Sequence, residues 1–302
     1  MKSISNSTRG IIYIIISAFC FALMAVFVRL SGNIHFIQKA FFRNSIAFII
    51  ALIFLIKEVN QNGKTIIIFP KICWLWLFLR SASGSLGVFG NFYAIDKILL
   101  ADAAILNKMA PFFTILFSFI LLKEKIKPIP LFAIIIAFFG AMLIVKPSFD
   151  FSKTIPTLVA FIGGLGAGFA YACIRKLSSY NCNGKVIVLF FSAFSMILST
   201  PYMIFNFNPM TLQQLIFLCL AGVCAAGGQF AITFAYSYAP AKDISIYDYS
   251  QIIFSTLMGL FFFGQIPDKY SFIGYFIIIL MALLNFLWQK KTIKTLTFLI
   301  VN

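Results

Sequence analysis

The chain has 302 residues, of which 62% are apolar and only 11% are charged, and its formal net charge is +16. A soluble domain usually has about a quarter of its residues charged, because charge keeps its surface in water. This composition excludes a soluble fold. Apolar runs of about 18 residues or more recur along the chain, and each is long enough to cross a lipid bilayer.

The basic residues lie mostly in short loops between the apolar runs, which argues against a nucleic-acid partner. Fifteen of the 24 Lys and Arg residues fall on one side of the predicted membrane and six on the other. The positive-inside rule then places both termini in the cytoplasm and the protein in the cytoplasmic (inner) membrane. The first apolar run, residues 10–30, is too long for a signal peptide and predicts the first span.

Ten membrane-spanning helices are expected, and their short connections make sequential helices antiparallel neighbours. The expected ranges are 10–31, 35–56, 72–95, 99–122, 129–146, 155–175, 185–205, 212–236, 242–264 and 270–289. The six cysteines follow no metal-ligand spacing, and the phosphate-binding pattern G-x-x-x-x-G-K-[ST] does not occur. We therefore expect no metal, no cofactor and no ATP hydrolysis.

The two halves of the chain align with each other at an offset of 141 residues. The coincident pairs include Gly87 with Gly228, Ala94 with Ala235, Asp102 with Asp243, and Phe113 with Phe254. Because each half has an odd number of helices, the second half must cross the membrane in the opposite sense. The expected fold is an all-α integral membrane protein with two inverted five-helix repeats, at 10–147 and 154–289, followed by a cytoplasmic tail at 290–302.

Two segments resemble signatures of the drug/metabolite transporter superfamily, in particular its EamA-type members. They are FYAIDKILLADAAILNKMAPFF followed by LLKEK, and YSQIIFSTLMGLFFFGQIPD. The resemblance covers nearly the whole chain. It implies a carrier without a prosthetic group, for amino acids, other metabolites or S-adenosylmethionine.

One departure from that pattern lies in the second half. The family often has proline thirteen residues before a terminal glutamate, as at Pro111 and Glu124, whereas the second half has Ile252 and Gln265. In the second helix, Arg43 resembles a family arginine and fits a structural anchor as well as a ligand.

Polar side chains at membrane depth are the best candidates for function, because a charge there costs about 2.5–3.5 kcal/mol. In the third helix, Arg80, Gly84, Gly87 and Asn91 share one stripe. One interpretation is a cavity wall where Arg80 and Asn91 contact a carboxylate. The alternative is that the glycines allow close helix packing while Arg80 reaches the lipid headgroups.

The eighth helix carries Gln229, Thr233 and Tyr236 on one face. As the counterpart of the third helix, it would form the opposite wall of the cavity. Amide, hydroxyl and phenol groups suit a zwitterionic or aromatic solute, and they suit hydrogen bonds between helices equally well.

The ninth helix begins with Asp243, Tyr247 and Gln251 on one face, while Asp248 points about 140° away from Asp243. Asp243 fits a helix N-cap. Asp248 is more than a turn deeper, where it can bind an amine, accept a proton or pair with a lysine. Tyr247 can stack on an aromatic solute.

The fourth helix supplies Asn107, the repeat counterpart of Asp248, and its neighbour Lys108. Both lie at matching depth from the opposite side of the membrane. We therefore expect Asn107, Lys108, Asp248 and Gln251 to face a central cavity.

These residues favour a secondary carrier that works by alternating access on a small-molecule substrate. An amino acid or amine-bearing metabolite is the first choice. Asp248 can bind the amine of a zwitterion, and Arg80 or Lys108 can bind its carboxylate. The alternatives are an S-adenosylmethionine-like or nucleoside-like solute, and a membrane sensor or scaffold without transport. An enzyme is disfavoured by the single histidine and the lack of H-E-x-x-H and G-x-S-x-G patterns. An acidic residue at membrane depth is compatible with proton coupling. The sequence does not predict the oligomeric state.

Overall fold

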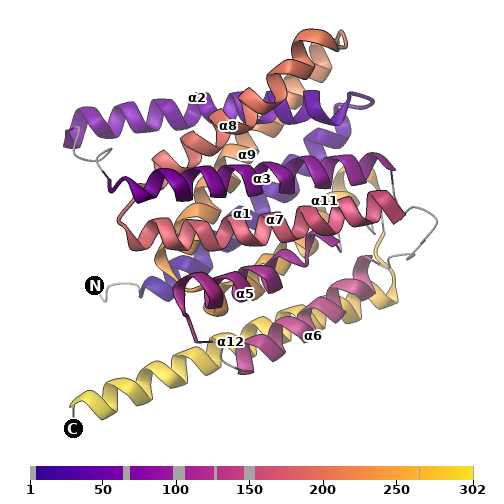
Figure 1. Cartoon of the computed structure of the whole chain (residues 1–302). Coiled ribbons are helices and arrows are strands. Elements are labelled where there is room, and N and C mark those ends of the chain that lie inside the picture. Colours follow the sequence, from indigo (N-terminus) through magenta and orange to yellow (C-terminus); the bar gives the residue numbers. More distant parts are fainter. Residues whose placement is uncertain are drawn as a thin grey trace.

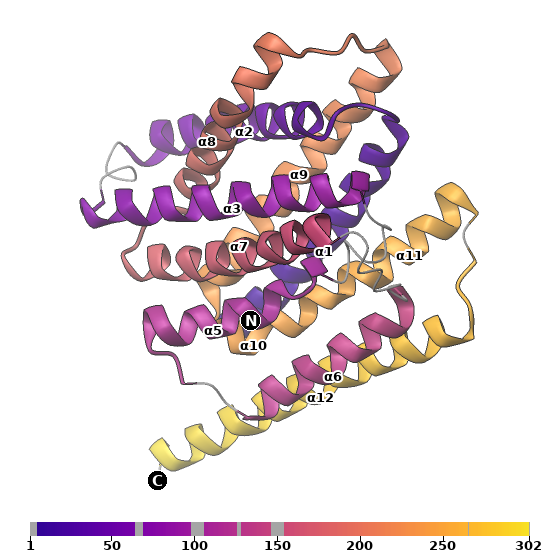
Figure 2. The same cartoon turned by 45° about the vertical axis from the view of Figure 1, so that its right-hand side comes forward.

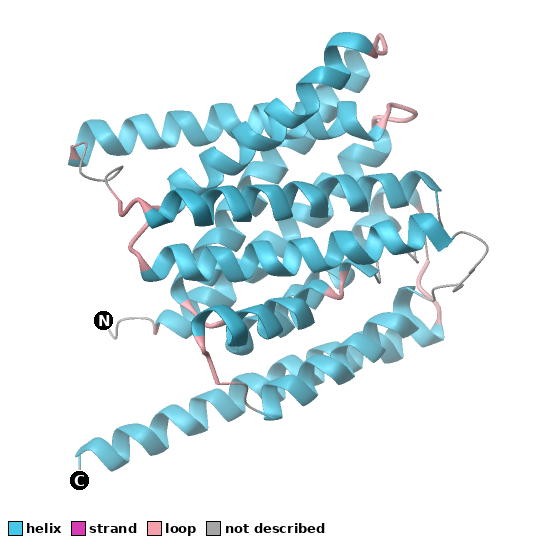
Figure 3. Cartoon of the chain, viewed as in Figure 1, coloured by secondary structure: helices cyan, strands magenta, loops and turns pink. Residues whose placement is uncertain are grey.

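The computed structural model describes residues 5–63, 69–97, 106–125, 128–145, 154–264 and 266–301. Within these ranges the protein is helical, without strands (Figure 3). The helices are α1 (Asn6–Leu30), α2 (Phe36–Asn62), α3 (Ile72–Lys97), α5 (Ala110–Leu122), α6 (Pro128–Val145), α7 (Thr154–Ser179), α8 (Gly184–Phe205), α9 (Leu212–Tyr238), α10 (Ala241–Ile244), α11 (Ser250–Phe263) and α12 (Lys269–Val301), with a 3₁₀ segment, η3 (Ser245–Tyr249), between α10 and α11.

Eight segments of the described chain are long and apolar enough to cross a membrane, and α5 and α6 are shorter apolar helices. A backbone in lipid must satisfy its own hydrogen bonds, so apolar sequences of this length form helices. Polar residues mark several helix starts. Thr211 forms a capping box with Gln214 at α9, and the side chain of Asn183 accepts from the backbone of Lys185 at α8.

The fourth and ninth helices differ from the continuous helices expected. The ninth span, Ala241–Phe263, changes from α to 3₁₀ geometry through η3 before α11 begins. In the fourth, residues 106–107 are helical, a turn follows at 108–109, and α5 then starts with Pro111 in its first turn. Proline cannot donate the backbone hydrogen bond that would continue the helix across this point. The expected start of this helix, including Asp102, lies outside the described residues.

The helices pack in a layered bundle (Figures 1 and 2). Helix α3 packs on α7, α1 on α9, and α2 on α8. Both α5 and α11 approach the bundle centre, α5 against α7 and α11 against α1. Helices α6 and α12 run side by side along one edge, and several of their large apolar side chains are exposed, as expected of a surface that faces lipid.

The glycines of α7 allow close helix approach. A Cβ atom at Gly164 would lie 2.6 Å from the backbone oxygen of Leu106, and one at Gly168 would lie 2.8 Å from that of Ala110. The stripe of small residues on α7 is therefore a packing surface for the start of α5.

Both chain termini lie at the same end of the helices (Figure 1). We call this the terminal end. It also carries the turn between α7 and α8, where Lys185 pairs with Glu58 at 3.0 Å. Which end faces the cytoplasm stays a prediction.

Candidate functional site

The two interrupted helices meet in the interior through Lys108. Its ammonium Nζ lies 2.8 Å from the Asp248 carboxylate Oδ2 and 2.7 Å from the Gln251 amide Oε1. It also donates to the backbone oxygen of Asp248 at 3.2 Å. An ammonium group has three donors. All three of its donors can therefore be satisfied, although the residue is only 5% exposed.

The contact between the two interruptions is reciprocal. While Lys108 donates to the backbone oxygen of Asp248, the hydroxyl of Tyr249 donates to the backbone oxygen of Lys108 at 3.2 Å. Lys108 and Tyr249 are themselves 141 residues apart, the offset that aligns the two halves. Backbone carbonyls at membrane depth need hydrogen-bond donors from the protein. Each interruption supplies one side-chain donor to a backbone carbonyl of the other.

Three of the four residues expected around the cavity are thus in direct contact: Lys108, Asp248 and Gln251. The fourth, Asn107, is partly exposed, and its backbone lies near Gly164 of α7. Its side chain is not part of the Lys108 cluster.

The expected faces of the ninth helix are corrected by its 3₁₀ segment. Spacing for a continuous α-helix placed Tyr247 with Gln251 and turned Asp248 away. In the structure Asp248 and Gln251 share the Lys108 ammonium, while the Tyr247 hydroxyl donates to the backbone oxygen of Ala282 in α12 at 3.2 Å. A 3₁₀ helix turns by a larger angle per residue than an α-helix, so α-helical spacing fails here.

Arg80 forms another polar contact between the halves. Its guanidinium Nη2 donates to the Gln229 Oε1 at 2.9 Å, and its centre lies 3.9 Å from the ring centroid of Phe191. The residue is 1% exposed, so it does not reach the lipid headgroups. A Cβ atom at Gly84 would lie 2.5 Å from its Nη1, so glycine there leaves room for the guanidinium. Arg80 of the α3 stripe and Gln229 of the α9 face are therefore in direct contact.

Tyr236 lies between the two contacts. Its ring stacks on that of Tyr171 with 5.1 Å between centroids, and its hydroxyl is 3.2 Å from the Ser245 Oγ. Tyr171 is near enough to interact electrostatically with both Arg80 and Asp248. The arginine and lysine contacts thus border one central region.

Asn91, predicted to lie in the same cavity wall, is further along α3. Eleven residues separate it from Arg80, which is about 16 Å along a helix. It is partly buried, and its backbone lies near Gly163 of α7. The structure does not bring Asn91 to the arginine.

A further polar chain connects α2, α3 and α8. Arg43 donates from Nη1 to the Asn44 Oδ1 at 3.2 Å and from Nε to the Met24 sulfur at 3.2 Å. Asn44 donates to the Ser195 Oγ at 3.2 Å, which is 3.0 Å from the Ser85 Oγ. Arg43 stands out in the sequence as an anchor or a ligand, but its partners do not, and only the adjacent Arg-Asn pair in an apolar run could have indicated them.

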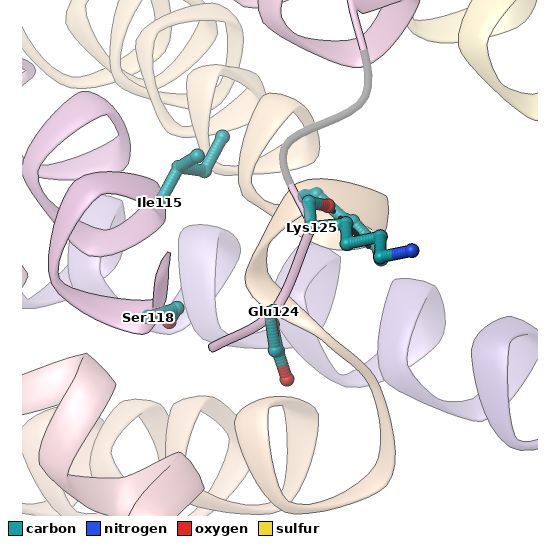
Figure 4. A pocket seen from close by; sticks show the side chains of 5 residues that line it. Ile115, Ser118, Glu124 and Lys125 are labelled. Carbon is teal, nitrogen blue, oxygen red and sulfur yellow. Dashed lines mark hydrogen bonds between the residues drawn. The ribbon is translucent and has the colours of Figure 1, made fainter. Parts of the chain in front are cut away.

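At the terminal end, the Glu124 carboxylate accepts from the Arg175 Nε at 3.0 Å, and Arg175 also donates to the backbone oxygen of Ser237 at 3.2 Å. This ties the end of α5 to α7 and α9. A small pocket opens beside Glu124, and its lining residues come from different elements (Figure 4). An ion pair that joins three helices at this end fits a structural or gate contact better than a solute ligand.

A sequence profile of the EamA-like transporter family matches residues 8–146 and again 154–287. The pseudopaline exporter CntI of Pseudomonas aeruginosa is 30% identical over 276 residues, covering 91% of this chain and 94% of the relative. An uncharacterized transporter of Helicobacter pylori is 27% identical over 288 residues, covering 91% and 93%. Solute carrier family 35 member G1 of Mus musculus is 29% identical over 282 residues, covering 87% and 74%.

The fold itself also has a solved counterpart. A crystal structure at 14% identity superposes with a TM-score of 0.80 and covers 94% of this chain and 98% of its own. At that identity the likeness concerns the fold alone. The profile matches, however, span nearly the whole chain. The chain therefore belongs to the EamA-like transporter family of the drug/metabolite transporter superfamily, and it is a multi-pass membrane transporter.

Proposed function

We propose that this transporter is a secondary carrier that moves an amine-bearing metabolite, with amino acids the first choice, by alternating access. The observation that carries the proposal is the contact of Lys108 with Asp248 and Gln251. It joins interrupted helices from the two halves of the chain. Paired interruptions of this kind mark the substrate site in several transporter folds.

Inverted five-helix repeats at 10–147 and 154–289 are part of this proposal. The family profile matches the two halves separately. The helix contacts are also paired as duplication would require, since α3 on α7 corresponds to α9 on α1. Left-handed residues end α5 and α11, at Lys123 and Gly264, which are again 141 positions apart. Such repeats would give the carrier two related gates around one site.

The substrate amine would compete with the Lys108 ammonium for Asp248. In the described conformation the ion pair is closed and buried, so the carboxylate is already neutralised. A substrate that brings its own amine would keep the buried Asp248 carboxylate paired when Lys108 leaves, whereas an unpaired buried carboxylate would be costly. Arg80 would bind a carboxylate of the same substrate after its bond to Gln229 is exchanged.

Proton coupling is a further part of the proposal. Once Lys108 leaves, Asp248 would need another partner, and a proton could neutralise it in place of a substrate amine. The lysine, a substrate amine and a proton would then compete for this carboxylate.

We further propose that the terminal end faces the cytoplasm, in the inner membrane. The support is the excess of basic residues predicted on that side, fifteen against six. A reporter fused to the C-terminus should then be active only if it functions in the cytoplasm. One relative is named as an exporter, so outward movement is the direction to test first.

The two alternatives have less support. Tyr247, which was expected to stack on a nucleoside-like solute, bonds to α12 and not to the central region. A sensor or scaffold without transport is disfavoured by membership of a transporter family.

Purified protein in liposomes tests the proposal. The assay measures uptake of labelled amino acids, S-adenosylmethionine, nucleosides and polyamines, with and without a pH gradient. Asp248→Asn should lower the flux at least tenfold, and Asp268→Asn, a matched change at the start of α12, should leave it unchanged. Lack of flux for every solute, in protein shown to be folded, would refute the carrier function.

A further inference from the structure

Two guanidinium groups are buried in the membrane region without a carboxylate. Arg43 is 3% exposed and Arg80 is 1% exposed. Neither forms an ion pair within the described part of the chain. Ion pairs formed there by other residues include Lys108 with Asp248, Arg175 with Glu124, and Lys185 with Glu58. A buried charge without a counter-charge is strongly destabilising, so its retention calls for an explanation.

The two arginines lie against neighbouring turns of α8. Arg80 covers the ring of Phe191, and the chain from Arg43 through Asn44 ends on Ser195. Phe191 and Ser195 are four residues apart and therefore lie on one face of the helix. We call these five residues, together with Gln229, the arginine cluster.

One donor of the cluster, Arg80 Nε, is buried and has no hydrogen-bond partner among the described residues. Buried donors are nearly always paired in stable proteins, so this nitrogen indicates a polar ligand.

The positive charge of the arginine cluster indicates that its ligand is anionic. Lys108 is already neutralised by Asp248, which leaves the two arginines as the uncompensated charges. A substrate with a single carboxylate would pair with one guanidinium and leave the other isolated. A substrate with two anionic groups would pair with both, and a guanidinium binds a carboxylate through two parallel hydrogen bonds.

We infer that the arginine cluster binds two carboxylates of one substrate, and that Arg43 is a substrate-binding residue together with Arg80. The inference rests on the proposed function, whose amine-bearing metabolite would then be an acidic amino acid or a related amino dicarboxylate. Gln229 holds the place of one carboxylate in the substrate-free state, through its bond to Arg80.

Thermal unfolding of the detergent-purified protein tests this with matched ligands that differ by one charge. The pairs are glutamate and glutamine, aspartate and asparagine, and succinate and succinamate. A ligand that binds only the folded state raises the unfolding temperature. The dicarboxylate of at least one pair should bind at least tenfold more tightly than its amide. Equal binding within every pair, tighter binding of the amides, or no shift with any ligand would overturn the inference.

Variants locate the effect. Arg43→Gln and Arg80→Gln should each abolish the preference for the dicarboxylate. Arg29→Gln, which changes an exposed arginine beside Phe263, should retain it. If Arg43→Gln does not fold, Arg43→Lys provides the test, because it keeps the charge but loses the paired hydrogen bonds. That variant should still prefer the dicarboxylate and bind it about tenfold more weakly, whereas unchanged affinity would contradict a direct contact.

Uptake in liposomes separates this inference from the proposed function. If amides but not dicarboxylates are carried, the protein is a carrier and the inference is wrong. If dicarboxylates bind with the expected preference in detergent and no solute is carried, the arginine cluster is a binding site and the carrier function is wrong.

Discussion

Separating Lys108 from Asp248 should destabilise the protein far more than the loss of one hydrogen bond. Both side chains are at most 10% exposed. Removing one partner of a buried ion pair costs about 3–5 kcal/mol, because the other charge is left in a medium of low polarity. Asp248→Asn retains a carbonyl oxygen for the ammonium, and the Gln251 amide remains 2.7 Å from Nζ. We therefore expect a loss near the lower limit, about 3 kcal/mol.

Lys108→Met should cost as much or more, since it leaves the carboxylate without its cation. The double variant should recover most of the loss, to within about 1–2 kcal/mol of the wild type, because both charges are gone and methionine fills the space. Thermal unfolding in detergent micelles measures these differences. At about 2 °C per kcal/mol, each single variant should unfold roughly 6 °C lower and the double variant no more than roughly 4 °C lower.

The ion pair of Lys185 with Glu58 provides the matched control. It has the same type of charges, and its side chains are 28% and 22% exposed at the terminal end. More exposed pairs contribute about 0–1 kcal/mol to the free energy of unfolding. Lys185→Met and Glu58→Gln should therefore each change it little, and their effects should add in the double variant. If the changes at Lys108 and Asp248 also add independently, or each costs less than about 1 kcal/mol, our reasoning about the buried pair is wrong.

Three further predictions follow from single contacts. Gly84→Ala should displace the guanidinium of Arg80, because the added Cβ would lie 2.5 Å from Nη1; uptake should fall at least tenfold, and wild-type uptake would contradict this geometry. Glu124→Gln should weaken the tie to Arg175 at the terminal end, with a loss of less than about 1 kcal/mol because the pair is partly exposed; labelling of a cysteine introduced nearby should become faster, and an unchanged rate would argue against a gate. Burial raises the pKa of the Cys182 thiol, in the turn between α7 and α8, to about 12. Less thiolate is then present at neutral pH, so maleimide labelling followed by mass spectrometry should be about a thousandfold slower than for an ordinary thiol.

The spans could be predicted from sequence because lipid imposes one requirement on all of them. A segment that crosses the hydrocarbon must be apolar over its length and helical in its backbone. Hydropathy reports both properties without knowledge of neighbouring segments. The interruptions in the fourth and ninth helices depend on distant partners. The carbonyl of Asp248 accepts from Lys108, 140 residues away, and no local pattern in residues 241–263 contains that information.

The site residues show the same distinction between regular and interrupted helices. Helical spacing grouped Arg80 with Gly84, which adjoin in the structure, and the counterpart relation placed Gln229 opposite, where it accepts from Arg80, because both helices are regular there. The same arithmetic misplaced Tyr247, because η3 changes the angle between successive side chains. Periodicity predicts which side chains share a face only as far as the helix geometry holds.

The proposed duplication explains why the two interruptions fit each other although their side chains differ. Residues 108 and 249 are equivalent under the 141-residue offset, and each donates a side-chain hydrogen bond to the backbone of the other interruption. Lysine at one position and tyrosine at the other preserve this exchange, but only the lysine carries a charge. Under the proposed duplication, the ion pair with Asp248 is thus an asymmetric feature on a symmetric framework. In the proposed carrier, opening either gate would separate these contacts, and a substrate that supplies its own charges would lower the cost of that separation. This would couple gate opening to the presence of substrate, as a carrier requires.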